Sequence, residues 1–246
     1  MKSYDSWPPG GSDPQIDALA RRHVRHDQLD LAALLADVDV GNIALVSSFG
    51  AESAILIHMV SSALERVPIL FIDTGKHFPE TYAYVETLKA ALNLRDVTFV
   101  KPDSKLVREE DPGGNLWRVN PNMCCTIRKN FALQDALTKF DGWISGRKRY
   151  QGGLRANLPF MERDGTLLKI NPLIHYTQDM IKAYFKQHDL PLHPLLDRGY
   201  RSIGCATCTI PAKEGEDPRS GRWSGVDKVE CGIHLGPSGS ISRFQT

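Results

Sequence analysis

The sequence has almost no excess of either charge, with 30 Lys and Arg residues against 29 Asp and Glu residues. This balance argues against a general nucleic-acid or membrane surface, so any affinity for anions must be local. No apolar run approaches the length of a membrane-spanning helix, and residues 1–9 lack the apolar core of a signal peptide. We therefore expect a cytoplasmic protein without nucleic-acid or membrane partners.

Cysteine is also scarce, at five residues in 246. Because cytoplasmic thiols stay reduced, these cysteines suggest metal or redox chemistry rather than a disulfide framework. Cys124 and Cys125 form one pair, Cys205 and Cys208 form a second, and Cys231 stands alone. Our hypothesis is that the paired thiols hold a metal centre and that the separate thiol carries out chemistry.

The rest of the composition predicts one large domain followed by an arm. With 41% hydrophobic residues, the chain can bury a full core. Pro, Gly and Ser crowd residues 1–12, which we expect to be a loose tail, and they dominate again from Glu214 onward. We therefore expect a folded domain over 1–213 and a mobile arm over 214–246 that carries Cys231.

Short apolar runs rich in β-branched residues alternate with helical patterns. We expect strands over 42–46, 68–72, 97–100, 143–146 and 167–170. We expect helices after the Asp13-Pro14 cap, after Ser53, over 79–91, from the first cysteine pair through Leu137, and over 177–187. This alternation indicates an α/β fold with a mostly parallel sheet, whose ligands bind outside the carboxyl ends of the strands.

Two polar turns follow expected strands. The turn from Ser47 to Ser53 precedes a helix, so its backbone N–H groups and the helix dipole favour an anion, and Gly50 lets a ligand approach closely. It is not a Walker loop, because no Gly-Lys-Ser/Thr follows, and an ordinary turn fits it equally well. Asp73-Thr74-Gly75 closes the next strand and either lines the same crevice or forms a local turn.

The paired thiols suit zinc or an iron–sulfur centre. The tandem Cys124-Cys125 favours the larger centre, because adjacent helical residues point about 100° apart and converge on one ion poorly. Arg128 and Lys129 follow one turn later and would offset thiolate charge. The alternative is that the four cysteines are buried and act as small hydrophobic residues.

Cys231 lies beside a glycine near several cations. His234, Arg219, Arg222 and Lys228 would favour its thiolate, whereas Glu230 would oppose it. The two arginines, three residues apart, are suited to clamping a phosphate or sulfate. Read alone, the segment is equally compatible with an incidental cysteine in a solvated basic tail.

Taken together, these residues resemble the iron–sulfur branch of the assimilatory adenylyl-sulfate (APS) and phosphoadenylyl-sulfate (PAPS) reductases. The segments that carry the resemblance are 48–52, 72–75, 124–129, 203–209 and 230–234. Two positions depart from the family pattern: Ser53 stands where an acidic residue is common, and Thr207 where a proline is common.

The resemblance implies an adenine-nucleotide hydrolase-like fold and a 4Fe–4S cluster on Cys124, Cys125, Cys205 and Cys208. It implies that adenosine and its α-phosphate contact Ser47, Ser48, Phe49, Gly50, Ala51, Glu52, Ser53, Ile72, Asp73, Thr74, Gly75 and Gly146. It implies that the phosphosulfate faces Lys129, Arg155, Arg219, Arg222 and His234. Cys231 would be the nucleophile, and the cluster cysteines point to APS rather than PAPS.

The expected reaction proceeds through an S-sulfocysteine on Cys231, which a thioredoxin or glutaredoxin-like dithiol then resolves to free sulfite. Because the sequence ends shortly after Cys231, we expect the reductant to be a separate protein, and we expect a homo-oligomer. The alternatives are a PAPS or dual-substrate reductase, a zinc-stabilised binding module, and a tRNA-thiolating enzyme. The last would need Ser-Gly-Gly-x-Asp-Ser where this chain has Ser-Phe-Gly-Ala-Glu-Ser.

Overall fold

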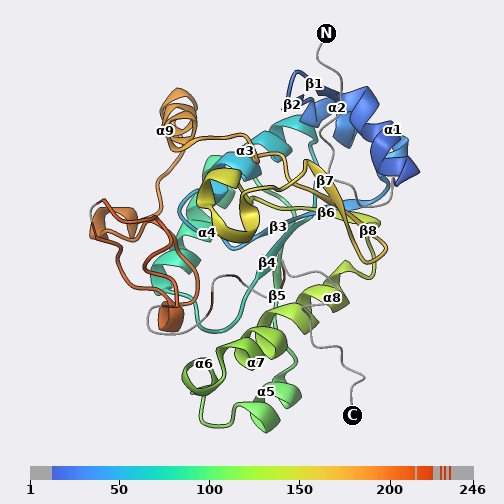
Figure 1. Cartoon of the computed structure of the whole chain (residues 1–246). Coiled ribbons are helices and arrows are strands. Elements are labelled where there is room, and N and C mark those ends of the chain that lie inside the picture. Colours follow the sequence, from blue (N-terminus) through green and yellow to red (C-terminus); the bar gives the residue numbers. More distant parts are fainter. Residues whose placement is uncertain (1–12, 214, 224–227, 229, 231–232, 234–246) are drawn as a thin grey trace.

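The computed structural model describes residues 13–213, 215–223, 228, 230 and 233. Its centre is a six-stranded sheet in the order β5-β4-β3-β6-β8-β7 (Figure 1). The strands are β3 (Ile43–Ser47), β4 (Ile69–Ile72), β5 (Val97–Val100), β6 (Gly142–Ile144), β7 (Met161–Asp164) and β8 (Leu167–Ile170). All neighbouring pairs are parallel except β7 with β8. The predicted α/β class with a mostly parallel sheet is therefore confirmed.

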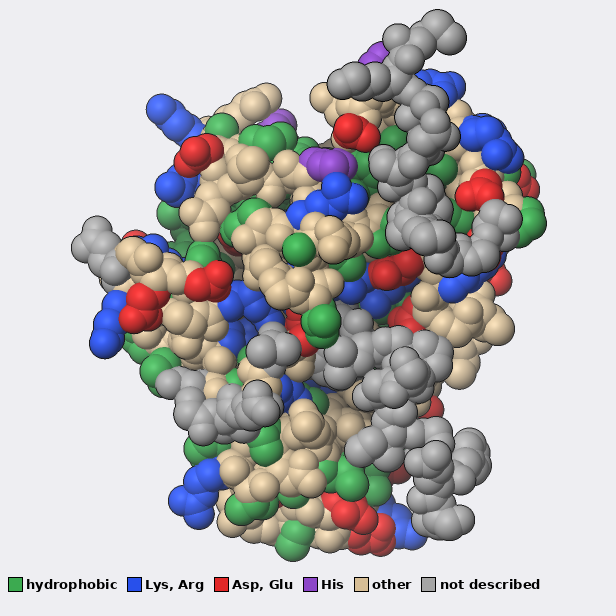
Figure 2. Space-filling view, in the orientation of Figure 1, with side chains coloured by type: hydrophobic (Ala, Val, Ile, Leu, Met, Phe, Trp, Pro, Cys, Tyr) green, Lys and Arg blue, Asp and Glu red, His purple; other side chains and the backbone are tan. Residues whose placement is uncertain are grey.

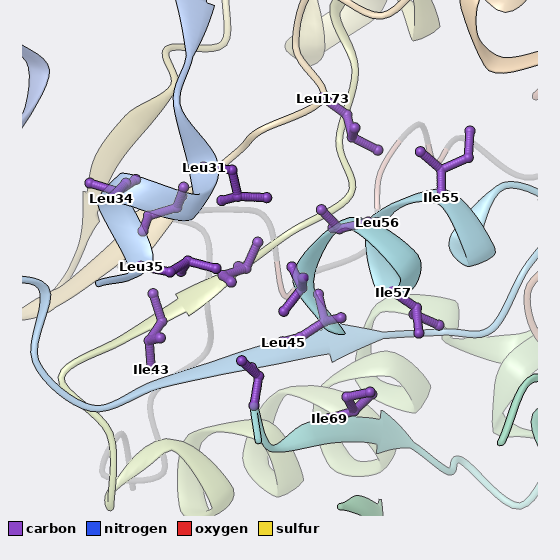
Figure 3. Close-up of a cluster of buried hydrophobic side chains, with 14 of the residues drawn as sticks. Leu31, Leu34, Leu35, Ile43, Leu45, Ile55, Leu56, Ile57, Ile69 and Leu173 are labelled. Carbon is purple, nitrogen blue, oxygen red and sulfur yellow. The ribbon is translucent and has the colours of Figure 1, made fainter. Parts of the chain in front are cut away.

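Helices cover both faces of the sheet, because side chains along each strand alternate between faces. Leu45 and Phe71 point into the larger core, and Val46 and Leu70 into the smaller one. The larger core is formed with α1 (Pro14–His23), α2 (Leu31–Leu35), α3 (Ser53–Ala63), α4 (Pro79–Ala91) and α9 (Gln178–Gln187), and the smaller with α8 (Phe131–Leu137). Figure 3 shows Leu45 of β3, Ile69 of β4, and Leu56 and Ile57 of α3 among the side chains of the larger core. Each such fully buried aliphatic side chain contributes roughly 1.5–3 kcal/mol.

A short hairpin separates the first two helices, α1 and α2. A hairpin of β1 (Val24–Arg25) and β2 (Gln28–Leu29) turns through His26 and Asp27, both at positive φ. The start of α1 follows the predicted cap, since the Asp13 carboxylate accepts hydrogen bonds from the next free backbone N–H groups. In the described part of the chain, no helix is both long and apolar enough to cross a bilayer.

The helix that carries the first cysteine pair differs from the prediction in where it begins. It starts at Pro121 rather than at the pair, because proline suits the first helical position and the Asn120 side chain accepts from the Met123 N–H. The helices here are α5 (Ser104–Glu110), α6 (Leu116–Val119) and α7 (Pro121–Cys125). A π-helical segment, Thr126–Asn130, joins α7 to α8, so both cysteines lie directly before a widened turn.

Candidate active site

A large pocket lies at the carboxyl ends of β3, β4 and β6, the edge where parallel sheets bind ligands. It brings together most of the residues that the sequence predicts to bind substrate. They are Ser47, Ser48, Gly50, Ala51, Glu52, Ser53, Ile72, Lys129, Gly146, Arg155, Arg219 and Arg222. On the face shown in Figure 2, basic and acidic side chains meet in the hollowed middle of the molecule.

The loop between β3 and α3 presents polar backbone to this pocket. The Ser47 hydroxyl accepts from the Phe49 N–H at 3.1 Å, and Glu52 precedes α3 without capping it through its side chain. The Ser53 N–H donates to the Gly50 carbonyl at 3.1 Å, and the next N–H groups of α3 have no side-chain cap, which suits an anion. Phe49 itself does not line the pocket: its ring is fully buried and packs edge-on against Phe71 at 5.3 Å.

Two cations of the loop after β6 belong to the pocket, although we did not predict them as site residues. Lys148 is buried and pairs with Glu52 at 2.9 Å, and its Nζ also donates to the Gly146 carbonyl. Burial lowers the pKa of Lys148, against the opposing effect of Glu52. Arg147 pairs with Glu162, and burial together with nearby Arg155 lowers the pKa of Arg147 to about 10. The sequence signal that could have identified Arg147 and Lys148 is their position directly after the strand expected over 143–146.

His77 is a further pocket residue that sequence reasoning missed. Its Nε2 lies 2.8 Å from the Ile72 carbonyl oxygen, whereas its buried Nδ1 has no hydrogen-bond partner among the described residues. Burial lowers the pKa of His77, so the neutral ring is favoured. No motif marks this residue, because its role depends on the turn that follows β4.

Three of the arginines that the family resemblance assigns to the phosphosulfate line the large pocket. Arg155 and Arg219 both contact the carboxylate of Glu230, at 2.5 and 3.3 Å. Arg222 stacks on Trp223, with 4.5 Å between its Cζ and the ring centroid. The buried Nε of Arg222 has no partner among the described residues, which leaves a donor for an anion.

The four paired cysteines line a second, smaller pocket together with Thr74, Lys76, Arg128, Lys129 and Trp223. Cys208 is half-buried and the other three are buried. Burial raises the pKa of the Cys124 thiol to about 11, even though Arg128 opposes the shift. Within the described residues, no group of three or more His, Cys, Asp or Glu side chains is arranged to hold a metal ion.

A buried ion pair supports this cysteine pocket. Arg128 donates to Asp111 at 2.7 Å and to the Thr74 carbonyl at 3.1 Å. Burial favours the protonated form of Asp111, but the hydrogen bonds from Arg128 and the Leu116 N–H outweigh it and lower its pKa. Thr74 also contacts Cys205, with 3.2 Å between Oγ1 and Sγ.

Of residues 72–75, Ile72 lines the large pocket and Thr74 lines the cysteine pocket. Asp73 accepts from the Tyr82 hydroxyl at 2.6 Å and from the Gly75 N–H at 3.0 Å, as expected of a turn.

The two pockets adjoin, because Lys129 and Trp223 line both. Cys231 and His234 lie outside the described residues. Glu230 and Ile233, on either side of Cys231 in the sequence, both line the large pocket.

Comparison with known proteins places the chain among reductases. The family model described as the phosphoadenosine phosphosulfate reductase domain matches residues 42–211. An adenosine 5′-phosphosulfate reductase of Chelativorans sp. is 47% identical over 231 residues, 92% of this chain and 94% of that protein. Adenosine 5′-phosphosulfate reductase 2 of Bacillus subtilis is 37% identical over 235 residues, covering 94% and 97%.

Solved structures agree with this placement. The phosphate complex of phosphoadenylyl-sulfate (PAPS) reductase from Candida auris has a TM-score of 0.66 at 27% identity, over 82% of this chain and 98% of that one. FMN adenylyltransferase of Candida glabrata has a TM-score of 0.54 at 14% identity, over 83% and 68%, and shares the fold alone. The chain belongs to the phosphoadenosine phosphosulfate reductase family, as its motifs predict.

Proposed function

We propose that this protein reduces adenylyl sulfate (APS) to sulfite and AMP, in the assimilation of sulfate towards cysteine. The observation that carries the proposal is that Arg155, Arg219 and Arg222 line the same pocket as Glu230 and Ile233, which flank Cys231 in the sequence. Positive charge there suits a phosphosulfate and brings it near the thiol that would react with it.

The rest of the large pocket suits adenosine. Leu45, Leu56 and Ile57 give it an apolar wall, which supports burial of a purine. The loop before α3 would receive the α-phosphate, because Gly50 lines the pocket and the N-terminus of α3 has no side-chain cap.

The reaction begins with attack of the Cys231 thiolate on the sulfonyl sulfur. The new S–S bond forms as the bond to the phosphate oxygen breaks, and AMP leaves with that electron pair. A reduced thioredoxin or glutaredoxin-like dithiol then attacks the Cys231 sulfur and releases sulfite, and its second thiol resolves the mixed disulfide. Arg219, Arg222 and Lys129 stabilise the charge that develops on the phosphate.

We infer that Cys124, Cys125, Cys205 and Cys208, which line the smaller pocket, would hold a 4Fe–4S cluster. Four thiols that line one buried pocket, next to Arg128 and Lys129, form a donor set for a negatively charged centre. The tandem Cys124-Cys125 favours a centre wider than one zinc ion, because adjacent helical residues point about 100° apart. When bound, the cluster would supply structural support and local charge, while Lys129 spans both pockets and would face the substrate.

The alternative substrate is PAPS, alone or beside APS. The cysteine quartet favours APS, because the PAPS branch of the family typically lacks it. Sulfite release from each nucleotide with reduced thioredoxin tests the choice: we expect turnover with APS and little with PAPS. Equal turnover of both would replace the proposal with a dual-substrate reductase.

Two further measurements test the residue roles. We expect Cys231→Ser to abolish sulfite release yet retain affinity for ADP, whose β-phosphate replaces the sulfonate. Sulfite release at the wild-type rate would refute the assignment.

We expect iron and acid-labile sulfide in anaerobically purified protein, whereas zinc in a colourless sample would favour a zinc-stabilised module.

The proposed function also involves the location, the oligomeric state and the C-terminal arm of the protein. We propose a cytoplasmic enzyme that acts as a homo-oligomer, with residues 214–246 forming the arm that carries Cys231 to the substrate and then to the reductant. Thiol–disulfide exchange requires the same sulfur to meet two partners in turn, which supports such an arm.

A further inference from the structure

The residue before the proposed nucleophile contacts the arginines proposed to bind substrate. Glu230 is 7% exposed, and both of its carboxylate oxygens contact Arg155, at 2.5 Å from Nε and 2.8 Å from Nη2. Arg219 reaches the same carboxylate at 3.3 Å. All three side chains line the large pocket. A carboxylate therefore lies where the proposed function needs a phosphosulfate oxygen.

The hydrogen-bonding geometry of Arg155 makes these two ligands compete. The Nε and Nη2 edge of a guanidinium is the fork that binds carboxylate, phosphate or sulfate through two bonds. Glu230 occupies that edge, and the Gln151 side chain accepts from Nη1. An anion can bind the fork of Arg155 only by displacing Glu230, and an anion bound beside Glu230 would be repelled by its charge.

We propose that the Glu230 carboxylate occupies the binding site for the substrate anion, formed by Arg155 and Arg219, when no ligand is bound. Binding of a phosphosulfate then displaces this carboxylate from both arginines. This inference rests on the proposed function for the identity of the ligand. Because Glu230 precedes Cys231 directly, release of the carboxylate frees the backbone that leads to the nucleophile. Glu230 is in this sense a positioning residue, which links occupation of the anion site to the placement of Cys231.

The test compares ADP with adenosine by calorimetry, using wild-type enzyme and Glu230→Gln. The amide keeps the size of the side chain but loses the charge that competes with an anion. We expect ADP to bind the variant about tenfold more tightly, because a charge-assisted contact no longer has to be broken. Adenosine, which carries no anionic group, should bind both proteins equally. A purely structural role for Glu230 would weaken both ligands instead.

The matched control is Glu110→Gln, which removes one negative charge from an exposed position on α5. We expect it to leave both affinities unchanged. If Glu110→Gln tightened ADP binding as much as Glu230→Gln, the effect would be one of net charge and the inference would be overturned.

A second measurement needs no variant. Amide hydrogen exchange over residues 228–233 of the wild-type enzyme should rise on addition of ADP and stay unchanged with adenosine. Unchanged exchange with ADP, or equal ADP affinity of wild type and Glu230→Gln, would overturn the inference and leave the proposed function intact. Failure of ADP to bind either protein would overturn both.

Discussion

At the scale of single residues, Gly204 allows Arg222 to approach the large pocket. A Cβ on Gly204 would lie 2.4 Å from Nη2 and 2.6 Å from Cζ of Arg222, closer than real side chains come. The clash is with the end of a flexible side chain, so the guanidinium would move rather than the backbone. Sequence alone marks this glycine only as part of a motif, because the approach of Arg222 depends on how residues 215–223 fold back.

We predict that Gly204→Ala weakens ADP binding about tenfold, since it displaces one charge-assisted donor, while unfolding free energy changes by less than about 1 kcal/mol. Calorimetry and urea unfolding measure the two effects. Gly113→Ala is the control, because its Cβ would meet Asn115 at an ordinary 3.5 Å. Unchanged ADP affinity in Gly204→Ala would show that Arg222 does not bind the anion.

Phe49 belongs to the motif over residues 47–53, but its side chain packs in the hydrophobic core. Its side chain is fully buried, so the ring holds the loop of residues 47–53 against the core. Its backbone has a φ of 47°, a strained conformation for a residue other than glycine. We predict that Phe49→Ala costs about 3–5 kcal/mol in urea unfolding, through the cavity that it leaves. Phe49→Leu should cost less and leave adenosine affinity near wild type. A large loss of adenosine affinity in a stable Phe49→Leu would instead place the ring against the ligand.

At the scale of elements, the ion pair of Asp111 and Arg128 joins the loop before α6 to the π-helical segment beside the cysteines. Asp111 also accepts from the Leu116 N–H at 2.9 Å. We predict that Asp111→Asn destabilises the protein by about 3–5 kcal/mol, because it leaves a buried guanidinium without its counter-charge. It should also lower the iron content of the purified protein.

Urea unfolding and iron analysis check this prediction against Glu110→Gln, an exposed neighbouring change expected to stay within about 0.5 kcal/mol of wild type. Equal stability of the two variants would mean that the buried pair contributes little to this part of the fold.

The sequence predicts the strands that are short and apolar, but it does not predict elements whose formation depends on contacts made in the folded chain. The runs in β3, β4 and β5 are short and apolar, so their positions were predictable to within a residue or two. Strand β7 was missed, because Met161-Glu162-Arg163-Asp164 carries mostly charged side chains at the sheet edge. The π-helical segment was also missed, since nothing in its residue types announces a shift in backbone hydrogen bonding.

The same contrast holds for the site. Residue types marked the turn over residues 47–53 and the pair Arg219 and Arg222 as candidates for binding an anion, but each also fitted an ordinary turn or a basic tail. Only the family resemblance pointed to Arg155. Lys148 and His77 escaped notice, since a buried lysine is recognisable only once its partner Glu52 is known. Glu230 was noticed only as a group opposing the thiolate, and its contact with Arg155 requires the folded chain.

At the scale of the whole molecule, the burial of Lys169 should make the free energy of unfolding depend on pH. Lys169 is 4% exposed, and burial, with a further contribution from Arg147, lowers its pKa to about 7. Between this value and the ordinary lysine pKa of 10.5, the unfolded chain holds a proton that the folded chain has released. Stability therefore rises with pH across that window, and this gain is absent below pH 7.

We predict that wild type gains stability over Lys169→Met between pH 7 and 10, by at most about 1.4 kcal/mol per pH unit. Urea unfolding of both proteins at pH 7, 8 and 9 measures the difference in slope. Parallel curves would show that Lys169 stays protonated in the fold, held by Glu162 and Asp164 at 3.8 and 3.9 Å.

The most direct test of the central claim is peptide mass spectrometry of the enzyme mixed with adenylyl sulfate in the absence of reductant. The account predicts the mass of one sulfonate on the peptide that contains Cys231, with Cys124, Cys125, Cys205 and Cys208 unmodified. Addition of reduced thioredoxin should remove that mass and release sulfite. An unmodified Cys231 in a protein that still produces sulfite, or a sulfonate on one of the paired cysteines, would contradict it.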